Sequence, residues 1–248
     1  MIQFRGVDDD SLLLSLYQIR EAAKLIWKID APRAIHNFPD HGVEHSERLA
    51  AISNRLLESN ESLPLDELEK YLLLAGIYLH DIGMQCDVVN YPDILKIAEQ
   101  LGAKFYHHFS SKTTNDFSIE EQLEIRKNHS FLTAAWISYA KLYNETVLAE
   151  AVKTIPEDII DDLMDICMFH SNLPITKCPI FFKYDPTKRK QLLAALLRFS
   201  DELDIDSSKA DIRIIKNFRL PAENAVYWWM HNRTRVIISD HNVIYLLF

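Results

Sequence analysis

Apolar residues recur every three to four positions through most of the first 205 residues, and this spacing is typical of helices that bury one face. The pattern breaks at 30–41, 103–117 and 171–186, which we predict to be loops. Ser118-Ile119-Glu120-Glu121 matches a capping box and Pro156 suits a first helical turn, so both mark helix starts. The predicted helices span 11–29, 42–59, 65–81, 91–101, 118–142, 145–153, 156–170 and 187–204.

After about residue 210 the pattern changes to short runs rich in β-branched and aromatic residues. The runs Ala225–Met230, Arg235–Ser239 and Val243–Phe248 predict strands, and Asp240-His241-Asn242 is typical of a hairpin turn. We therefore predict a mainly α protein, with a helical bundle over 1–206 and a small antiparallel β unit over 207–248. The sequence stops inside an apolar run, so either the last strand completes the fold or the chain is a truncated piece of a longer protein.

Composition narrows the classes of function. The chain is 48% hydrophobic and 25% charged, with only 5 Gly in 248 residues, which indicates a compact, helix-rich protein. With a net charge of −9, the protein is not expected to have the basic surface that binding to nucleic acid or to an anionic membrane requires. Apolar runs such as Tyr71–Leu79 are far shorter than the roughly 20 residues of a membrane helix. Three cysteines without C-x-x-C spacing, and a start unlike a signal peptide, predict a cytoplasmic protein.

Histidine and aspartate occupy inward positions on five of the predicted helices. A single buried histidine is most simply a core residue that hydrogen-bonds a backbone carbonyl. A buried carboxylate, however, is costly unless it is paired or coordinates a metal, so the whole set favours a bound cation. The inward positions are His45 with Leu49, Ile52 and Leu56; His80 and Asp81 after Leu73, Leu74 and Ile77; His129 with Ile125, Leu132 and Trp136; His170 with Leu163, Ile166 and Cys167; and Asp201 and Asp204 with Leu193 and Leu197.

The ligand types narrow the choice of metal. Imidazole and carboxylate without thiolate favour Mn, Fe, Zn, Co or Ni, and a set of six positions favours an octahedral ion over tetrahedral structural zinc. Cys167 lies among these residues, but we assign it to core packing. The expected ligands of one ion are His45, His80, Asp81 and Asp201, and those of a second ion are His129 and His170, with Asp81 as a bridge.

A different interpretation arises from His41-x-x-Glu44-His45, which fits the H-x-x-E-H pattern of inverted zinc proteases. In such a site both histidines bind zinc from adjacent helical turns. Here Pro39, Asp40 and Gly42 place the helix start near His41, so His41 lies less firmly on the buried stripe than His45. A protease would also leave the other inward His and Asp residues unexplained. His41 is then either a helix-cap residue or a substrate contact near the metal.

Three segments in order, EHSERLAAI, LHDIG and FSDELDI, resemble the H…HD…D motif of the HD-domain superfamily of metal-dependent phosphohydrolases. RKNHSFLTAAWI and MFHSNL look like the extra histidine positions of subfamilies that bind two metals. Over about residues 38–206, the chain looks most like the subfamily fused to Hsp90-like ATPase or nucleotide-cyclase modules. The resemblance implies that His45, His80, Asp81 and Asp201 are metal ligands. The GYP signature of the branch that hydrolyses cyclic dinucleotides is missing.

The predicted function is hydrolysis of a nucleotide or other phosphate ester by water, with one or two divalent ions (Mn, Fe, Ni, Mg or Zn) as cofactors. Asp81, His129 and Arg126 are the predicted catalytic residues. The alternative is a non-catalytic HD module that senses a nucleotide or metal and regulates a fused or partner ATPase or cyclase. The expected partner in either case is a small phosphate ester, not a membrane or a nucleic acid.

The predicted substrate contacts are His41, Arg126, Arg198 and Lys183. Arg126 and Arg198 each lie one turn before a predicted ligand, where a guanidinium can clamp a phosphate. For Arg198 a salt bridge that orients the ligand is the simpler interpretation. The basic loop Lys177–Lys190 carries aromatic residues, so it either receives a nucleotide by base stacking or is a solvated loop.

Overall fold

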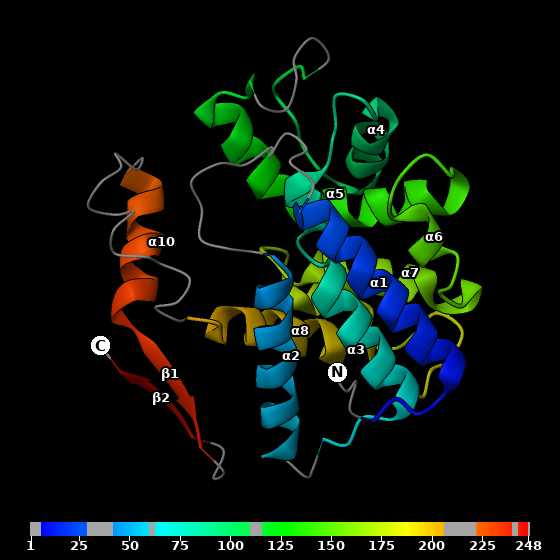
Figure 1. Cartoon of the computed structure of the whole chain (residues 1–248), viewed down its shortest axis with the longest axis vertical. Coiled ribbons are helices and arrows are strands. Elements are labelled where there is room, and N and C mark those ends of the chain that lie inside the picture. Colours follow the sequence, from blue (N-terminus) through cyan, green and yellow to red (C-terminus); the bar gives the residue numbers. More distant parts are fainter. Residues whose placement is uncertain are drawn as a thin grey trace. The chain divides into compact units, whose positions relative to one another are not determined.

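The computed structural model describes residues 6–28, 42–59, 63–109, 116–205, 222–239 and 243–247, which are mainly helical (Figure 1). The chain divides into two compact units. Unit 1 consists of residues 1–35 and 65–198, and unit 2 consists of residues 36–64 and 199–248. The predicted class, mainly α with a small antiparallel sheet late in the sequence, is confirmed. The predicted domain boundary near residue 206 stays a prediction.

Unit 1 is organised around its long helix α5, which contacts α4, α6, α7 and the short 3-10 turn η1. A second layer of contacts joins α1 to α3 and α3 to α7, and α1 and α3 run side by side in Figure 1. The elements of unit 1 are α1 (Asp10–Lys28), α3 (Glu67–Leu79), η1 (Ile82–Gln85), α4 (Pro92–Leu101), α5 (Ile119–Leu142), α6 (Ala149–Val152), η3 (Glu157–Ile159), α7 (Ile160–Phe169), η4 (Ile175–Lys177) and α8 (Lys190–Leu203), the last of which continues into unit 2 from Phe199.

Local sequence signals explain where the central helices begin. The predicted capping box at the start of α5 is confirmed, because the Ser118 hydroxyl accepts from the Glu121 amide and the Glu121 carboxylate accepts from the Ser118 amide. Asp66 and Glu69 form a second capping box at the start of α3. Every residue of α3 from Tyr71 to Leu79 is buried, so this helix forms the interior of unit 1.

Several helices are shorter in the structure than the sequence predicted. The helix predicted over 65–81 ends at Leu79, and the chain then turns sharply through His80 and Asp81 into η1. The helix predicted over 145–153 is reduced to α6, and the segment after Pro156 begins as the 3-10 turn η3 before it becomes α7. Among the described residues, no helix has the length and apolar character needed to cross a membrane.

Unit 2 contains α2 (Val43–Glu58), the end of α8, α10 (Ala222–Arg233), and strands β1 (Arg235–Ile238) and β2 (Ile244–Leu247). The predicted hairpin is confirmed: β1 and β2 pair antiparallel, with Arg235 opposite Leu247 and Ile238 opposite Ile244. The predicted turn at 240–242 lies outside the described residues.

The strand predicted at Ala225–Met230 is wrong, because these residues lie within α10. A short apolar run does not distinguish a strand from a buried helical segment. The burial pattern does not alternate as a half-buried strand would. Trp228 is buried, whereas Val226, Trp229 and Met230 are exposed, and strict alternation would instead have placed Val226, Trp228 and Met230 on one face.

Candidate metal centre

His80 and Asp81 lie at the end of α3, where the helix stops and η1 begins. His80 is the C-cap residue of α3, and Asp81 precedes η1 with a backbone conformation outside the helical range. Both side chains are buried, and His80 Nε2 lies 3.2 Å from Asp81 Oδ2. The turn therefore brings two adjacent residues to one point, whereas a continuous helix would have separated them by about 100°.

Two more histidines of unit 1 approach the same carboxylate from other helices. His129 of α5 and His170 at the end of α7 are both buried, and their Nε2 atoms lie 3.2 Å and 3.5 Å from Asp81 Oδ1. The two Nε2 atoms are 3.0 Å from each other. The structure thus brings together His80, Asp81, His129 and His170, four of the six predicted ligands, within unit 1.

Each of these three histidines is oriented by its own helix. The Nδ1 atoms of His80 and His129 donate to the carbonyls of Ile77 (2.9 Å) and Arg126 (2.6 Å), and Nδ1 of His170 donates to the carbonyl of Cys167. In every case the acceptor lies three residues earlier. Because a neutral imidazole carries one proton, a ring that donates through Nδ1 has its lone pair on Nε2, which is the atom aimed at Asp81.

The cluster is rich in lone pairs and negative charge, and this property decides whether a metal cation fits between its side chains. Lone pairs of His129 and His170 that face each other at 3.0 Å cannot satisfy one another, and the Asp81 carboxylate adds negative charge. Burial lowers the pKa of His170, and the rings of His80 and His129 act in the same direction, although Asp81 opposes them. One ligand atom each from His80, Asp81 and His170 lies within 4.8 Å of the others. This donor set fits a divalent cation that accepts nitrogen and oxygen ligands.

Cys167 does not add a sulfur ligand. Its side chain is fully buried, and burial raises the pKa of the thiol, so the sulfur stays protonated at neutral pH. Its contribution is the backbone carbonyl that holds the His170 ring. This agrees with the predicted packing role.

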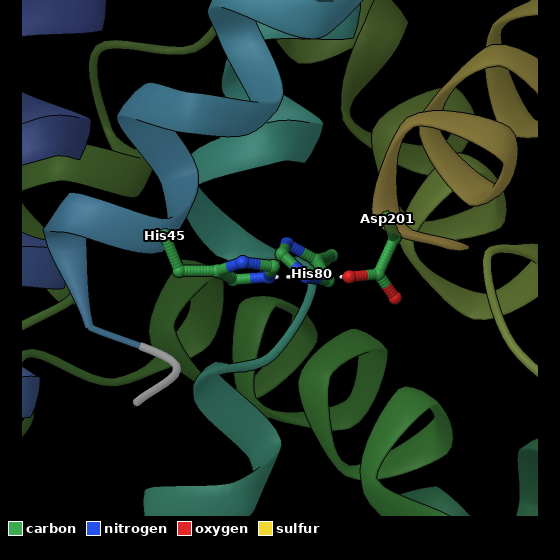
Figure 2. Close-up of side chains that lie close together, drawn as sticks. All are labelled: His45, His80 and Asp201. Atoms are coloured by element: carbon green, nitrogen blue, oxygen red, sulfur yellow. Dashed lines mark ion pairs between the residues drawn. The ribbon is translucent and has the colours of Figure 1, made fainter. Parts of the chain in front are cut away.

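Unit 2 holds the remaining two predicted ligands, His45 on α2 and Asp201 on α8. His45 is fully buried, and its Nε2 atom lies 3.2 Å from Asp201 Oδ1, a contact drawn as a dashed line in Figure 2. Nδ1 of His45 lies 2.5 Å from Asp204 Oδ2, and Arg48 Nε donates to Asp204 Oδ1 at 3.0 Å. Glu44 is exposed, so the glutamate that a zinc protease would need faces away from the buried His45 ring.

Thr133 and Gly83 form a contact that the sequence analysis missed. The Thr133 hydroxyl donates to the His80 carbonyl (2.8 Å) and accepts from the Gly83 amide (2.9 Å). One side chain of α5 therefore holds the backbone on both sides of Asp81. A Cβ at Gly83 would lie 2.1 Å from the His129 carbonyl oxygen, so only glycine allows this approach. The one signal in the sequence is the spacing: Thr133 follows His129 by four residues and shares its helix face.

The predicted substrate contacts are not gathered in one place. Arg126 is half-buried on α5, one turn before His129, whose ring its carbonyl orients. Arg198 donates through Nη1 to the Leu173 carbonyl at 3.0 Å, so it fastens the loop after α7. Lys183 pairs with Asp161, at the opposite end of α7 from His170 and roughly 13 Å away along the helix axis. His41 lies outside the described residues.

The basic loop is largely neutralised by ion pairs within unit 1. Phe182, one of its predicted stacking residues, is buried in the core, whereas Phe181 and Tyr184 are exposed. Salt bridges engage four of the cations between residues 177 and 190, so they are held internally. The pairs are Lys183 with Asp161 (2.8 Å), Lys188 with Asp66 (2.6 Å), Arg189 with Glu69 (2.6 Å), and Lys190 with Asp162 (2.8 Å) and Asp165 (2.5 Å).

A helical unit in which an HD doublet meets further histidines in its interior is the arrangement of an HD-type domain. A model of the HD-CE family matches residues 35–246, which is most of the chain, and the protein therefore belongs to the HD-CE family. The match continues through α10 and β1 and into β2. Comparison with curated proteins and with solved structures gave no match.

Proposed function

We propose that this protein is a metal-dependent phosphohydrolase that hydrolyses a nucleotide or another phosphate ester. The observation that carries the proposal is the cluster of three Nε2 atoms around the Asp81 carboxylate in unit 1. Membership in the HD-CE family supports an HD-type domain. A buried group of lone pairs and negative charge has no role in packing, and it gains most from a divalent cation.

The residues of the chain divide the work between them. The carbonyls of Ile77, Arg126 and Cys167 fix the tautomers of the three rings, so the rings need no rearrangement when an ion arrives. A bound divalent ion lowers the pKa of water and neutralises charge on phosphoryl oxygens. Asp81 has two carboxylate oxygens on different histidines, so it suits a bridge between two ions.

The proposal includes His45 and Asp201 on the strength of the sequence resemblance. They match the first and last positions of the H…HD…D motif, and we propose that they serve as ligands of the same ion as His80 and Asp81. Their own contact, 3.2 Å between His45 Nε2 and Asp201 Oδ1, supports this role, because it joins an imidazole nitrogen to a carboxylate. The ions that suit nitrogen and oxygen ligands are Mn, Fe, Ni, Mg and Zn, one or two per chain.

Substrate recognition is proposed for Arg126, the predicted contact nearest in sequence to a cluster ligand. We propose that this guanidinium, one turn before His129 in the sequence, holds a phosphate by two hydrogen bonds. Because internal carboxylates neutralise most of the basic loop, we propose that the metal and Arg126 supply most of the positive charge that the substrate meets. The proposed setting is a cytoplasmic protein of the subfamily fused to Hsp90-like ATPase or cyclase modules.

The test combines metal analysis with a substrate screen. We expect purified protein to carry a divalent metal and to hydrolyse at least one member of a panel of nucleotides or bis(p-nitrophenyl) phosphate. The variant His80→Ala, Asp81→Ala serves as the control and should lose both metal and activity. If the wild type binds metal stoichiometrically but hydrolyses nothing beyond the level of this variant, the proposal of an enzyme should be dropped in favour of a nucleotide- or metal-sensing module.

A further inference from the structure

The four histidines described above differ in what holds their Nδ1 atoms. His80, His129 and His170 each donate to a carbonyl of their own helix. In His45 the Nδ1 atom instead contacts a carboxylate, at 2.5 Å from Asp204 Oδ2. Both side chains are almost completely buried, at 0% and 2% exposure. A contact this short between a buried ring and a buried carboxylate is strong and holds the ring in one orientation.

Arg48 holds the Asp204 carboxylate in place. It lies on α2 one turn after His45, and its Nε atom donates to both oxygens of Asp204, at 3.0 Å and 3.3 Å. Arg48, Asp204 and His45 therefore form a continuous polar chain within unit 2, which ends at His45 Nε2.

We infer that Asp204 is a positioning residue that strengthens the binding of a divalent cation by His45. The carboxylate holds the Nδ1 proton, so Nε2 keeps its lone pair, and the partial transfer of charge into the ring makes Nε2 a better electron donor. This inference rests on the proposed role of His45 as a metal ligand. It assigns to Asp204 a function distinct from that of Asp201, although the two aspartates are one helical turn apart.

The inference is tested by calorimetric titration of the 248-residue, metal-stripped protein with Mn²⁺. Asp204→Asn has the same shape but no charge, and loss of such a partner is expected to weaken Mn²⁺ binding by about 10–100-fold. Asp204→Glu restores the carboxylate. It should therefore retain more Mn²⁺ affinity than Asp204→Asn, even if the longer side chain lowers thermal stability further.

The matched control is Ser53→Ala. Ser53 Oγ and Ser200 Oγ share a buried hydrogen bond of 2.7 Å that also joins α2 to the end of α8, but it does not involve a proposed ligand. This variant should lose thermal stability and keep its Mn²⁺ affinity. The inference is overturned if Asp204→Asn binds Mn²⁺ as the wild type does, or if Ser53→Ala weakens binding equally.

A third result separates this inference from the proposed function. Wild-type protein that binds no Mn²⁺, Zn²⁺ or Ni²⁺ would overturn the metal centre itself, and the role of Asp204 with it. Wild-type protein that binds metal and hydrolyses phosphate esters, combined with an unaffected Asp204→Asn variant, would overturn the role of Asp204 alone.

Discussion

Gly83→Ala tests whether the close approach of η1 to α5 sets the geometry of the HD doublet. The new Cβ would lie 2.1 Å from the His129 carbonyl oxygen and 2.7 Å from the Thr133 amide nitrogen. Contacts of a Cβ below 3.0 Å are essentially never found, so η1 must move away from α5 by about 0.9 Å. Both atoms belong to the backbone of a long buried helix, and neither can yield as a side chain would.

The expected cost follows from this displacement. Overpacking of a close contact costs about 1–3 kcal/mol. The two hydrogen bonds of Thr133 to the His80–Gly83 turn stretch at the same time, and each contributes about 1 kcal/mol. A total of about 3–5 kcal/mol lowers the Tm of a chain of this size by roughly 6–20 °C. Metal–ligand distances tolerate shifts of only about 0.2 Å, so Mn²⁺ affinity should fall at least about tenfold.

Differential scanning fluorimetry and Mn²⁺ titration measure the two effects. Gly76→Ala in the preceding helix α3 is the control, because its Cβ would meet side-chain methyl groups and no backbone atom, with Ile166 Cγ2 at 3.1 Å and Leu197 Cδ2 at 3.5 Å. Alanine also favours a helix over glycine by about 1 kcal/mol, so little change is expected there. A Gly83→Ala protein with wild-type Tm and Mn²⁺ affinity would refute the reasoning.

Three further predictions concern the same unit. Thr133→Val leaves the Gly83 amide and the His80 carbonyl without their hydroxyl partner, and should lower the free energy of unfolding by about 1–3 kcal/mol, whereas Thr133→Ser should stay near wild type in urea denaturation. Burial tends to raise the pKa of Glu69, but the hydrogen bonds that it accepts from Arg189 lower the pKa by more than burial raises it. The pKa of Glu69 therefore lies below its ordinary value of 4.5. The stability that this carboxylate provides is therefore complete above pH 4.5 and is lost as the pH falls through the lowered pKa. The Glu69→Gln variant should flatten this acid part of the curve of unfolding free energy against pH. An unchanged slope below pH 4.5 would contradict the assignment. Removal of metal by a chelator should lower the Tm by roughly 5–10 °C relative to protein in Mn²⁺ at a concentration of 100 times its Kd, because ligand binding then contributes about 2.7 kcal/mol. Equal Tm values with and without the chelator would show that no such site exists.

The sequence predicted the cluster well because helical periodicity decides which side chains face inward. His80, His129 and His170 each continue an apolar stripe, so the sequence indicates that they face the interior of unit 1, but the meeting of His80 with Asp81 depends on the end of α3 at Leu79, which the predicted helix over 65–81 did not include. The difference in burial between Asp201 and Asp204 could not be anticipated from the sequence. Both lie on the same stripe, yet the side chain of Asp201 is 32% exposed and that of Asp204, which contacts His45 and Arg48, is 2% exposed.

Features that depend on contacts between distant segments were beyond sequence reasoning. The partners of the basic loop, Asp66 and Glu69, precede Lys188 and Arg189 by 122 and 120 residues, so the loop looked available for a ligand. The Thr133 hydroxyl gains its role only because a glycine of another element lies against it. Local composition misled in α10, where aromatic residues favour a strand locally but packing of Trp228 favours a helix.

The hydrogen bonds from Nδ1 to carbonyls three residues earlier have a consequence for the speed of metal uptake. Because each ring is fixed by the helix that carries it, the rings lose their rotational freedom when unit 1 folds, before any ion is present. An arriving cation then meets a preorganised set of donors, and the entropy of ordering these rings no longer opposes its binding. Metal uptake by the folded apoprotein should therefore be governed by loss of the ion's own water shell, with no slow conformational phase.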